Sequence, residues 1–438
     1  MAIIPQKQIF SWKEIENLAD LQRFSLLIEY LPDEKLMQRL ESLRSKGRND
    51  YPVRAIWNSI LAGIVYQHQS VESLRRELMR NAQLRQLCGF DLFKGIASVP
   101  SSNAYSNFLK LLVRHSELID AIFYDLVEKL GELLPGFGKT LAIDSKAIRS
   151  RSRKESKRRH VDSRGESDAD KGVKTYKGKR KDGSVWETVK SWFGFKLHLI
   201  VDADYELPID YKVTKASASD ITEGRDMVAE IASNRPKVLQ NAELFLGDKG
   251  YDDTELITTL WDDHHVKPVI DIRNLWKVDG ARLVHGQNNV SHDHKGTVFC
   301  HCPVTWEKRP MAFGGFEQDR NTLKYRCPAK HYGFECKGTD RCWISDNIRI
   351  DINSNPRIFT PLARSSYKWK TVYKKRSSVE RVNSRLDESF GFEKHFIRGI
   401  KKMKVRCSLA LIVMLGMAYG RVKEKQPDKL RSLVQPAA

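Results

Sequence analysis

The chain has 438 residues, of which 41% are hydrophobic and 30% are charged. This length and hydrophobic content exclude a disordered or fibrous chain and predict two or three folded domains. The formal net charge of +20 predicts an anionic polymer as the partner, first of all nucleic acid, because a large positive surplus attracts phosphate backbones.

Neither a membrane protein nor a secreted protein is expected. The longest apolar run, 409–419, is shorter than the roughly 20 residues of a spanning helix, and the N-terminus lacks the pattern of a signal peptide. Five of the seven cysteines lie between residues 300 and 342, unlike an extracellular disulfide framework. We therefore expect a protein of the reducing cytoplasm that binds no membrane.

Residues 12–134 carry leucine and isoleucine at spacings of three and four, which is typical of amphipathic helices. Ser70 and Glu72 precede a basic helical segment, so Ser70 is a candidate N-cap. We predict an all-helical domain over residues 1–134. This domain either binds DNA or is an ordinary bundle with a solvated basic surface.

Two predicted strands end in aspartate. The apolar run 140–143 closes on Asp144, and the run 242–247 leads into Asp248 before a glycine turn and a helix. Sites form at the carboxyl ends of strands in open α/β sheets, although a single aspartate after a strand is commonly a turn residue or a helix cap. Both aspartates are therefore candidates for catalysis.

Between these strands the sequence predicts a basic loop followed by a hairpin. Residues 145–182 predict a flexible basic loop, which either grips phosphates beside Asp144 or is merely solvated. The runs 193–202 and 207–213 predict an antiparallel hairpin. The loop and the hairpin contain these candidate DNA contacts: Arg151, Arg153, Lys154, Arg158, Arg159 and Lys196.

Two further elements complete this region. Residues 220–233 predict a helix with Asp220 as its cap, and 266–270 predicts an edge strand, where Pro268 is tolerated.

The segment 371–388 predicts a helix that holds Glu380 in a polar row. An apolar stripe beside the row lets the helix bury one side. The row consists of Tyr373, Arg376, Glu380, Asn383 and Asp387, and the stripe consists of Val372, Val379, Val382 and Leu386. Three carboxylates from separate elements, Asp144, Asp248 and Glu380, suffice to hold two Mg²⁺ or Mn²⁺ ions.

Cysteines concentrate in the interval 271–361, with His301 and His331 nearby. Thiolates in a reducing compartment favour a tetrahedral zinc site, but no Cys-x-x-Cys pair is present, and free buried thiols are the alternative. The candidate ligands of one structural Zn²⁺ are Cys302, Cys327, Cys336 and Cys342.

These motifs resemble those of DDE-type insertion-sequence transposases, which have a ribonuclease H-like catalytic core. The matching stretches are Leu-Ala-Ile-Asp-Ser at Asp144, Phe-Gly-Phe-Lys-Leu-His at 193–198, Leu-Gly-Asp-Lys-Gly-Tyr-Asp at Asp248 and Tyr-Lys-Lys-Arg-Ser-Ser-Val-Glu at Glu380. Residues 51–90 also resemble the helical leader domain of that family.

The resemblance implies a mixed α/β (α+β) fold with a ribonuclease H-like sheet flanked by helices. It implies a catalytic core made of 135–272 and 362–420, behind the all-α N-terminal domain. The cysteine-containing interval 273–361 would be an insertion in this core, and 421–438 a charged tail.

The resemblance also implies function. We expect a metal-dependent enzyme that cuts double-stranded DNA at the ends of an insertion sequence and joins the 3′-hydroxyl ends to target DNA, as a homodimer or larger assembly in a bacterial cytoplasm, associated with the nucleoid. Tyr373 and Arg376 would contact DNA. The family signature ends in a lysine where this chain has Asp387, and Lys394 or Arg385 are candidate substitutes. The alternatives are a non-catalytic, sequence-specific DNA-binding protein derived from a transposase, and a nuclease without strand transfer.

Overall fold

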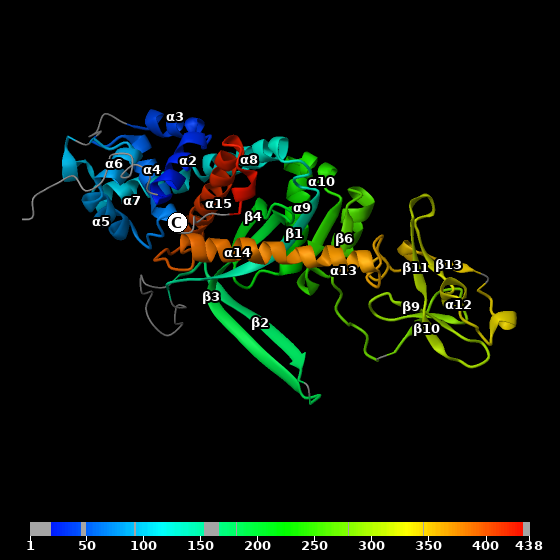
Figure 1. Ribbon diagram of the computed structural model, residues 1–438. Helices are drawn as coiled ribbons and strands as arrows, with labels where there is room; N and C mark the ends of the chain where they lie inside the picture. Colours follow the sequence, from blue (N-terminus) through cyan, green and yellow to red (C-terminus); the bar gives the residue numbers. More distant parts are fainter. Residues whose placement is uncertain are drawn as a thin grey trace, which may run out of the picture.

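The computed structural model describes residues 19–44, 50–91, 93–152, 166–180, 182–278, 280–344 and 346–431. Figure 1 shows an elongated arrangement, with the N-terminal helices at one end, a mixed sheet in the middle and a small β subdomain at the other end. This combination of a helical N-terminal region with a mixed sheet and flanking helices confirms the predicted fold class.

The N-terminal region is helical, as predicted. Ser70 caps α5 by accepting a hydrogen bond from the Ser73 amide at 3.2 Å, which confirms the predicted cap. The helices are α2 Ala19–Tyr30, α3 Glu34–Ser42, α4 Val53–Val65, α5 Val71–Arg80, α6 Ala82–Cys88, η1 Gly95–Ser98, α7 Ser102–Arg114 and α8 Ser116–Leu133.

The central sheet has six strands in the order β2-β3-β1-β5-β6, with β4 paired to β3. β1 pairs antiparallel with β3 and parallel with β5, and β5 pairs parallel with β6. The strands are β1 Thr140–Arg149, β2 Asp170–Lys179, β3 Val185–Asp202, β4 Leu207–Lys215, β5 Leu244–Gly247 and β6 Lys267–Ile270. The predicted β3–β4 hairpin and the predicted edge strand β6, which contains Pro268, are confirmed.

Two strand predictions were wrong. β1 does not end at Asp144 but continues to Arg149, because β3 supplies antiparallel partners as far as Gly194. Residues 170–179 are not loop but the strand β2, which pairs with the first half of β3 and forms a ribbon that projects from the body (Figure 1).

The ribbon is stabilised by tryptophans that lie across from glycines. A Cβ at Gly172 would lie 2.5 Å from the Trp192 ring, and one at Gly178 would lie 2.6 Å from the Trp186 ring. Only glycine therefore fits under each indole. Because the paired strands bury little apolar surface, the alternation that marks a half-buried strand is weak here.

The helices that flank the sheet carry or support the site. The predicted helix at residue 220 is confirmed, but its cap is Ser219, whose Oγ accepts from the Thr222 amide at 3.4 Å. Asp220 is the first helical residue. The elements are α9 Asp220–Asn234, α10 Pro236–Asn241, η2 Lys249–Tyr251, α11 Thr254–Thr258, η3 Thr259–Asp263, α13 Tyr367–Tyr373, η7 Lys374–Arg376, α14 Ser377–Phe390, α15 Ile400–Lys423 and η8 Pro427–Lys429.

The apolar helix α15 joins the N-terminal helices to the sheet. It packs against α2, α8 and β4, and one hydrophobic core runs through all of them. Within the described residues, α15 is the one helix with the length and composition of a membrane span, and 83% of its apolar window is buried in the protein. A Cβ at Gly416 would lie 2.6 Å from Leu27 Cδ1, so glycine allows the close approach of α15 and α2.

Residues 271–361 form the small β subdomain, which has a hydrophobic core of its own. Its strands are too short for hydrophobic alternation to reveal them in sequence. One sheet has the order β10-β9-β8-β7 and the other β11-β12-β13. The elements are β7 Arg282–Leu283, β8 Val290–His292, β9 Val298–His301, β10 Lys308–Pro310, β11 Ala312–Glu317, η4 Gln318–Arg320, β12 Thr322–Arg326, α12 Pro328–Tyr332, η5 Thr339–Arg341, β13 Asn347–Asp351 and η6 Ile352–Ser354.

Candidate active site

Parallel pairing of β1 and β5 brings Asp144 and Asp248 to the same edge of the sheet. The last residues that pair are Ala142 and Leu246, and each aspartate lies two residues beyond its strand's last pair. The Asp248 carboxylate accepts a hydrogen bond from the Gly250 amide at 2.7 Å, which fixes its orientation at the start of the η2 turn. The two predicted catalytic aspartates therefore lie together.

The two carboxylates influence each other electrostatically. Burial, followed by repulsion from Asp248, raises the pKa of Asp144 to about 6. Lys174, the Ser145 amide and Arg376 act in the opposite direction, and Ser145 N donates to Asp144 Oδ1 at 2.7 Å. A carboxyl with this pKa is held in a site that disfavours a second negative charge.

Glu380 lies in the first turn of α14, and the preceding turn η7 packs against β1 and β5. Its side chain is half exposed and accepts a hydrogen bond from Arg376, which also acts on Asp144. Among the described residues, no three Asp, Glu, His or Cys side chains are grouped as a metal site. The structure thus brings Asp144 and Asp248 together and links Glu380 to them through Arg376.

The donor chemistry at this edge fits a divalent cation. Two hard carboxylates lie side by side, and their repulsion would be relieved by positive charge.

Tyr373 and Arg376 form a short column beside the aspartates. The predicted helix over 371–388 is interrupted by the 3₁₀ turn η7, in which residues three apart eclipse each other. The Arg376 guanidinium accordingly lies over the Tyr373 ring at 5.9 Å, and that ring stacks on Trp369 at 4.5 Å. Burial raises the pKa of Tyr373 to about 12, so the phenol stays protonated.

Lys196 is engaged within the protein. Its ammonium donates to the Ala218 carbonyl at 2.6 Å and to Asp220 at 2.9 Å, and the side chain is buried. Lys174 on β2 donates to Ser145 next to Asp144. Lys174 could not be predicted as a site residue, because it lies in a segment predicted to be a loop, and only the pairing of β2 with β3 reveals its position.

Asp387 forms an ion pair with Lys146 on β1, and Glu393 lies 3.3 Å from the same ammonium. Lys146 is two residues from Asp144 on the strand, so its side chain emerges on the same face. Of the two candidate substitutes for the family lysine, Arg385 donates to the Glu206 carbonyl and Lys394 lies on the surface. A positive charge thus lies beside the signature position, supplied by a different element.

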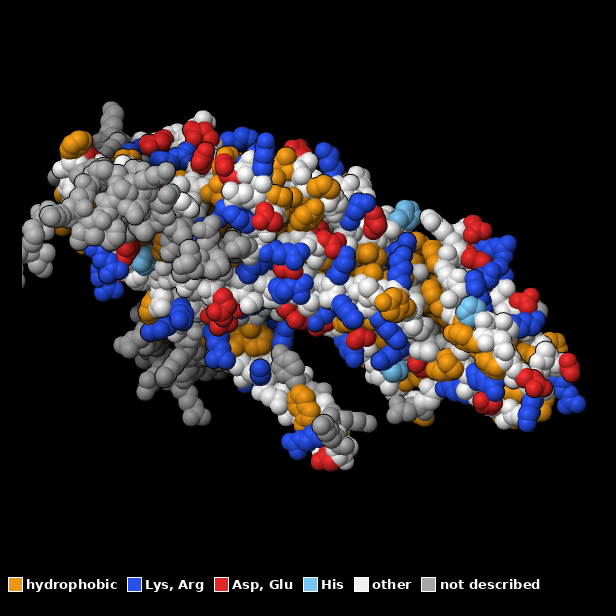
Figure 2. All heavy atoms as spheres, in the orientation of Figure 1, with side chains coloured by type: hydrophobic (Ala, Val, Ile, Leu, Met, Phe, Trp, Pro, Cys, Tyr) orange, Lys and Arg blue, Asp and Glu red, His pale blue; other side chains and the backbone are white. Residues whose placement is uncertain are grey.

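The other predicted DNA contacts fall in the basic loop. Arg151 stacks over the Phe396 ring at 4.5 Å. The following four candidates lie outside the described residues: Arg153, Lys154, Arg158 and Arg159. Figure 2 shows Lys and Arg side chains spread over the visible face of the body and on the projecting ribbon.

The cysteines of the β subdomain approach one another. Cys300, Cys327 and Cys342 pack against the same core, and Cys302 adjoins Cys336. Burial and the three neighbouring thiols Cys327, Cys342 and Cys336 raise the pKa of Cys300 to about 11. No described set is arranged for metal binding, so zinc stays a prediction.

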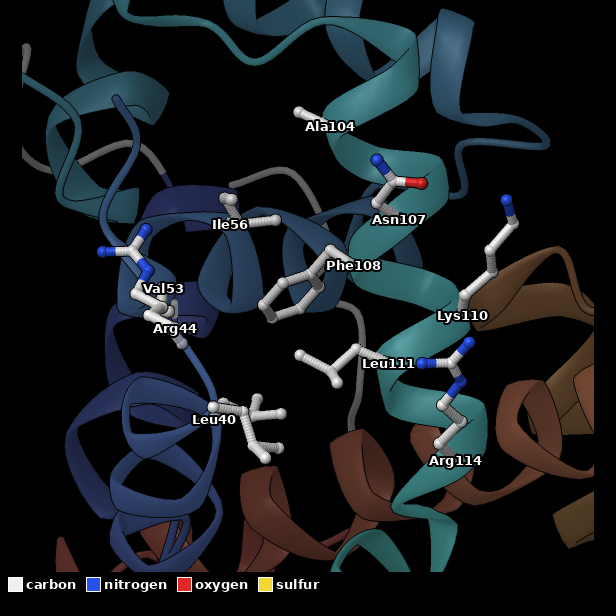
Figure 3. A pocket seen from close by; sticks show the side chains of 11 residues that line it. Leu40, Arg44, Val53, Ile56, Ala104, Asn107, Phe108, Lys110, Leu111 and Arg114 are labelled. Carbon is white, nitrogen blue, oxygen red and sulfur yellow. The ribbon is translucent and has the colours of Figure 1, made fainter. Parts of the chain in front are cut away.

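A separate pocket of about 340 Å³ opens between α3, α4 and α7. In Figure 3 its floor is apolar, with Leu40, Ile56 and Phe108, and Arg44 and Arg114 lie at its rim. It contains none of the acidic residues described above, so it is not part of the candidate active site.

Comparison with known proteins gives two family matches. Residues 135–415 match the family described as "Transposase DDE domain", and residues 10–111 match "Transposase domain (DUF772)". No curated protein matches the chain. A cryo-EM structure of a piggyBac transposase synaptic complex with hairpin DNA aligns with 12% identity and a TM-score of 0.31, over 97% of this chain and 87% of that chain. That likeness is too weak to support any structural argument.

The raised pKa of Asp144 predicts a pH-dependent stability. The folded chain binds the proton of the Asp144 carboxyl more tightly than the unfolded chain does. Protonation of Asp144 therefore stabilises the fold, fully below about pH 4, and this stabilisation is lost as the pH rises through about 6. Asp144→Asn in EDTA should therefore raise the free energy of unfolding by about 1 to 3 kcal/mol at pH 8 and by much less at pH 4. Denaturant unfolding measures this. An equal effect at both pH values, or the same gain in the exposed control Asp262→Asn, would contradict the assignment.

The ion pair of Asp387 predicts a charge effect on DNA binding. Asp387→Lys restores the family charge beside Lys146, and should raise affinity for DNA ends and steepen the salt dependence by about one counterion. Fluorescence anisotropy at several salt concentrations measures both. Glu388→Lys, at the next and exposed position of α14, is the matched control. If Asp387→Lys and Glu388→Lys raise the affinity for DNA ends equally, Asp387 does not face the DNA.

Proposed function

This chain belongs to the family of transposases with a DDE domain, whose model matches residues 135–415, and we propose that it cuts DNA at the ends of an insertion sequence and joins the freed 3′-hydroxyl ends to target DNA. The observation that carries the proposal is the pair Asp144 and Asp248 at one sheet edge, with Glu380 linked to it through Arg376.

Asp144, Asp248 and Glu380 would hold two Mg²⁺ or Mn²⁺ ions. Bound divalent cations supply activation of the attacking water and stabilisation of the departing 3′ oxygen. Glu380 joins the aspartates when Arg376 exchanges it for a DNA phosphate, since the guanidinium can grip either anion in a bidentate manner. DNA binding and completion of the carboxylate set are thereby coupled.

Tyr373 would orient the cleaved nucleotide. Its ring is fixed by stacking on Trp369, and its phenol stays protonated as a donor. Arg376 and Lys174 supply positive charge beside Asp144, which favours the phosphate backbone over a neutral ligand.

The partner is double-stranded DNA, at the element ends and at the target. The net charge of +20 and the helical N-terminal region support this assignment. The protein would act as a homodimer or larger assembly on DNA, in a bacterial cytoplasm and associated with the nucleoid. Seven cysteines that all remain free in the structure are consistent with that compartment.

The rival function is a non-catalytic DNA-binding protein derived from a transposase. The aspartate pair argues against this rival. Two adjacent carboxylates in a partly buried site lower the stability of a fold unless a bound cation neutralises them. DNA binding that survives EDTA, with no cutting under any metal, would favour this rival. A nuclease without strand transfer would cut but leave no joined product.

The proposal predicts that Asp248→Asn abolishes cutting. With Mg²⁺ and DNA carrying the terminal inverted repeats that flank the coding region, strand cleavage should fall by at least about a hundredfold, because a ligand of the ions is lost. Asp262→Asn, an exposed aspartate in η3, makes the same chemical change elsewhere and should cut normally. Undiminished Mg²⁺-dependent cleavage by Asp248→Asn would contradict the assignment of Asp248 as a catalytic metal ligand.

For the β subdomain we propose one structural Zn²⁺ held by thiolates of Cys302, Cys327, Cys336 and Cys342, with Cys300 close enough to compete. The mutual approach of these thiols supports it. Purified chain should contain about one equivalent of zinc, and Cys327→Ser should lose it while Cys88→Ala, in α6, keeps it. Less than about a tenth of an equivalent in the unmodified chain would remove the idea.

A further inference from the structure

A fourth acidic side chain, Asp220, lies at the same edge of the sheet. It is the first residue of α9, and Ser219 rather than Asp220 caps that helix. Asp220 Oδ1 accepts a hydrogen bond from Lys196 Nζ at 2.9 Å. The same ammonium donates to the Ala218 carbonyl at 2.6 Å, so the buried lysine fixes one oxygen of Asp220 in place.

The second oxygen of Asp220 faces the catalytic pair. A Cβ built on Gly250 would lie 2.7 Å from Asp248 Oδ1 and 3.8 Å from Asp220 Oδ2. A side chain at position 250 would therefore collide with the Asp248 carboxylate, and the Asp220 carboxylate lies within contact distance of the same point. Lys196 satisfies Asp220 Oδ1, and the Ser145 side chain also hydrogen-bonds the Asp220 carboxylate.

An unsatisfied buried hydroxyl points to the same space. Tyr251 is 1% exposed, and its hydroxyl has no hydrogen-bond partner of normal geometry in the described part of the chain, although Ser145 lies near it. The negative charges of Asp220, Asp144 and Asp248 all raise the pKa of this phenol. A buried polar atom without a partner is costly, so the site is built for a group that the protein itself does not supply.

The surroundings hold Asp220 as a charged group. Lys196 and Lys174 supply positive charge, and together with Ser145 they keep the pKa of Asp220 below its usual range despite burial. His198 lies 3.9 Å away but stays neutral, since burial lowers its pKa to about 4. Asp220 is thus an ionised carboxylate with one oxygen anchored by Lys196 and the other beside the Asp248 carboxylate.

We propose that Asp220 is a fourth carboxylate of the active site, whose Oδ2 acts with Asp248 on a divalent cation, with the Tyr251 hydroxyl hydrogen-bonding in the same shell. The identity of that cation as Mg²⁺ or Mn²⁺ rests on the proposed function. The competing account is a structural ion pair, in which Asp220 serves only to neutralise Lys196.

Binding of Mn²⁺ to the full chain without DNA separates these accounts. Electron paramagnetic resonance measures free Mn²⁺ directly. Asp220→Asn should weaken binding by about ten- to hundredfold. The matched control is Asp226→Asn, on the same helix and paired with Lys212 at the surface, which should bind as the unmodified chain does.

Tyr251→Phe provides a second variant that keeps every charge. It removes the buried hydroxyl that has no partner of normal geometry among the described residues, and should weaken Mn²⁺ binding even where Asp220→Asn fails to fold. The proposal is overturned if folded Asp220→Asn or Tyr251→Phe binds Mn²⁺ normally, or if the unmodified chain shows no Mn²⁺ binding. Because no DNA is present, weakened binding supports the proposal even if the unmodified chain never cuts DNA, a result that would count against the proposed function alone.

Discussion

Repulsion between Asp144 and Asp248 is the constraint around which the site is arranged. Parallel pairing of β1 with β5 forces the two carboxylates to one edge of the sheet, where burial makes a second negative charge expensive. Positive charges on Lys174 of the ribbon and Arg376 of η7 partly offset this repulsion. The pair of carboxylates lowers the stability of the fold, and the proposed cation would relieve their repulsion.

Rigid support for this edge comes from elements far apart in sequence. α14 buries Val379, Val382 and Leu386 and so holds Glu380 and Arg376 at a fixed height over β1. Behind it, α15 continues the hydrophobic core from the sheet into the N-terminal helices. The helical region and the sheet therefore share one continuous core, while the Arg376 and Glu380 side chains lie at its edge.

Sequence patterns predicted the elements whose signals are local. The run closing on Asp144, the run leading into Asp248 and the polar row at Glu380 could each be found, because hydrophobic periodicity and spacing lie within a few residues. The ribbon strand β2 could not, since its stability comes from long-range pairing and from glycines under tryptophans. The lysine beside Asp387 was likewise invisible, because Lys146 lies 241 positions away in the chain.

Asp220 could not be predicted as a site residue for the same reason, since its position depends on long-range packing. Its sequence context is that of a helix cap, and only the packing of α9 against β1 and η2 brings it close to the aspartates. The candidate site is therefore made of side chains from β1, β5, α9 and the α13–α14 segment, which come together only in the fold.

Anomalous diffraction from crystals of the protein bound to an element end in Mn²⁺ tests the central claim most directly. The account predicts manganese peaks at coordination distance, about 2.2 Å, from carboxylate oxygens of Asp144 and Asp248, with Glu380 released from Arg376. Manganese absent from this edge, with Glu380 still paired to Arg376 on bound DNA, would contradict it.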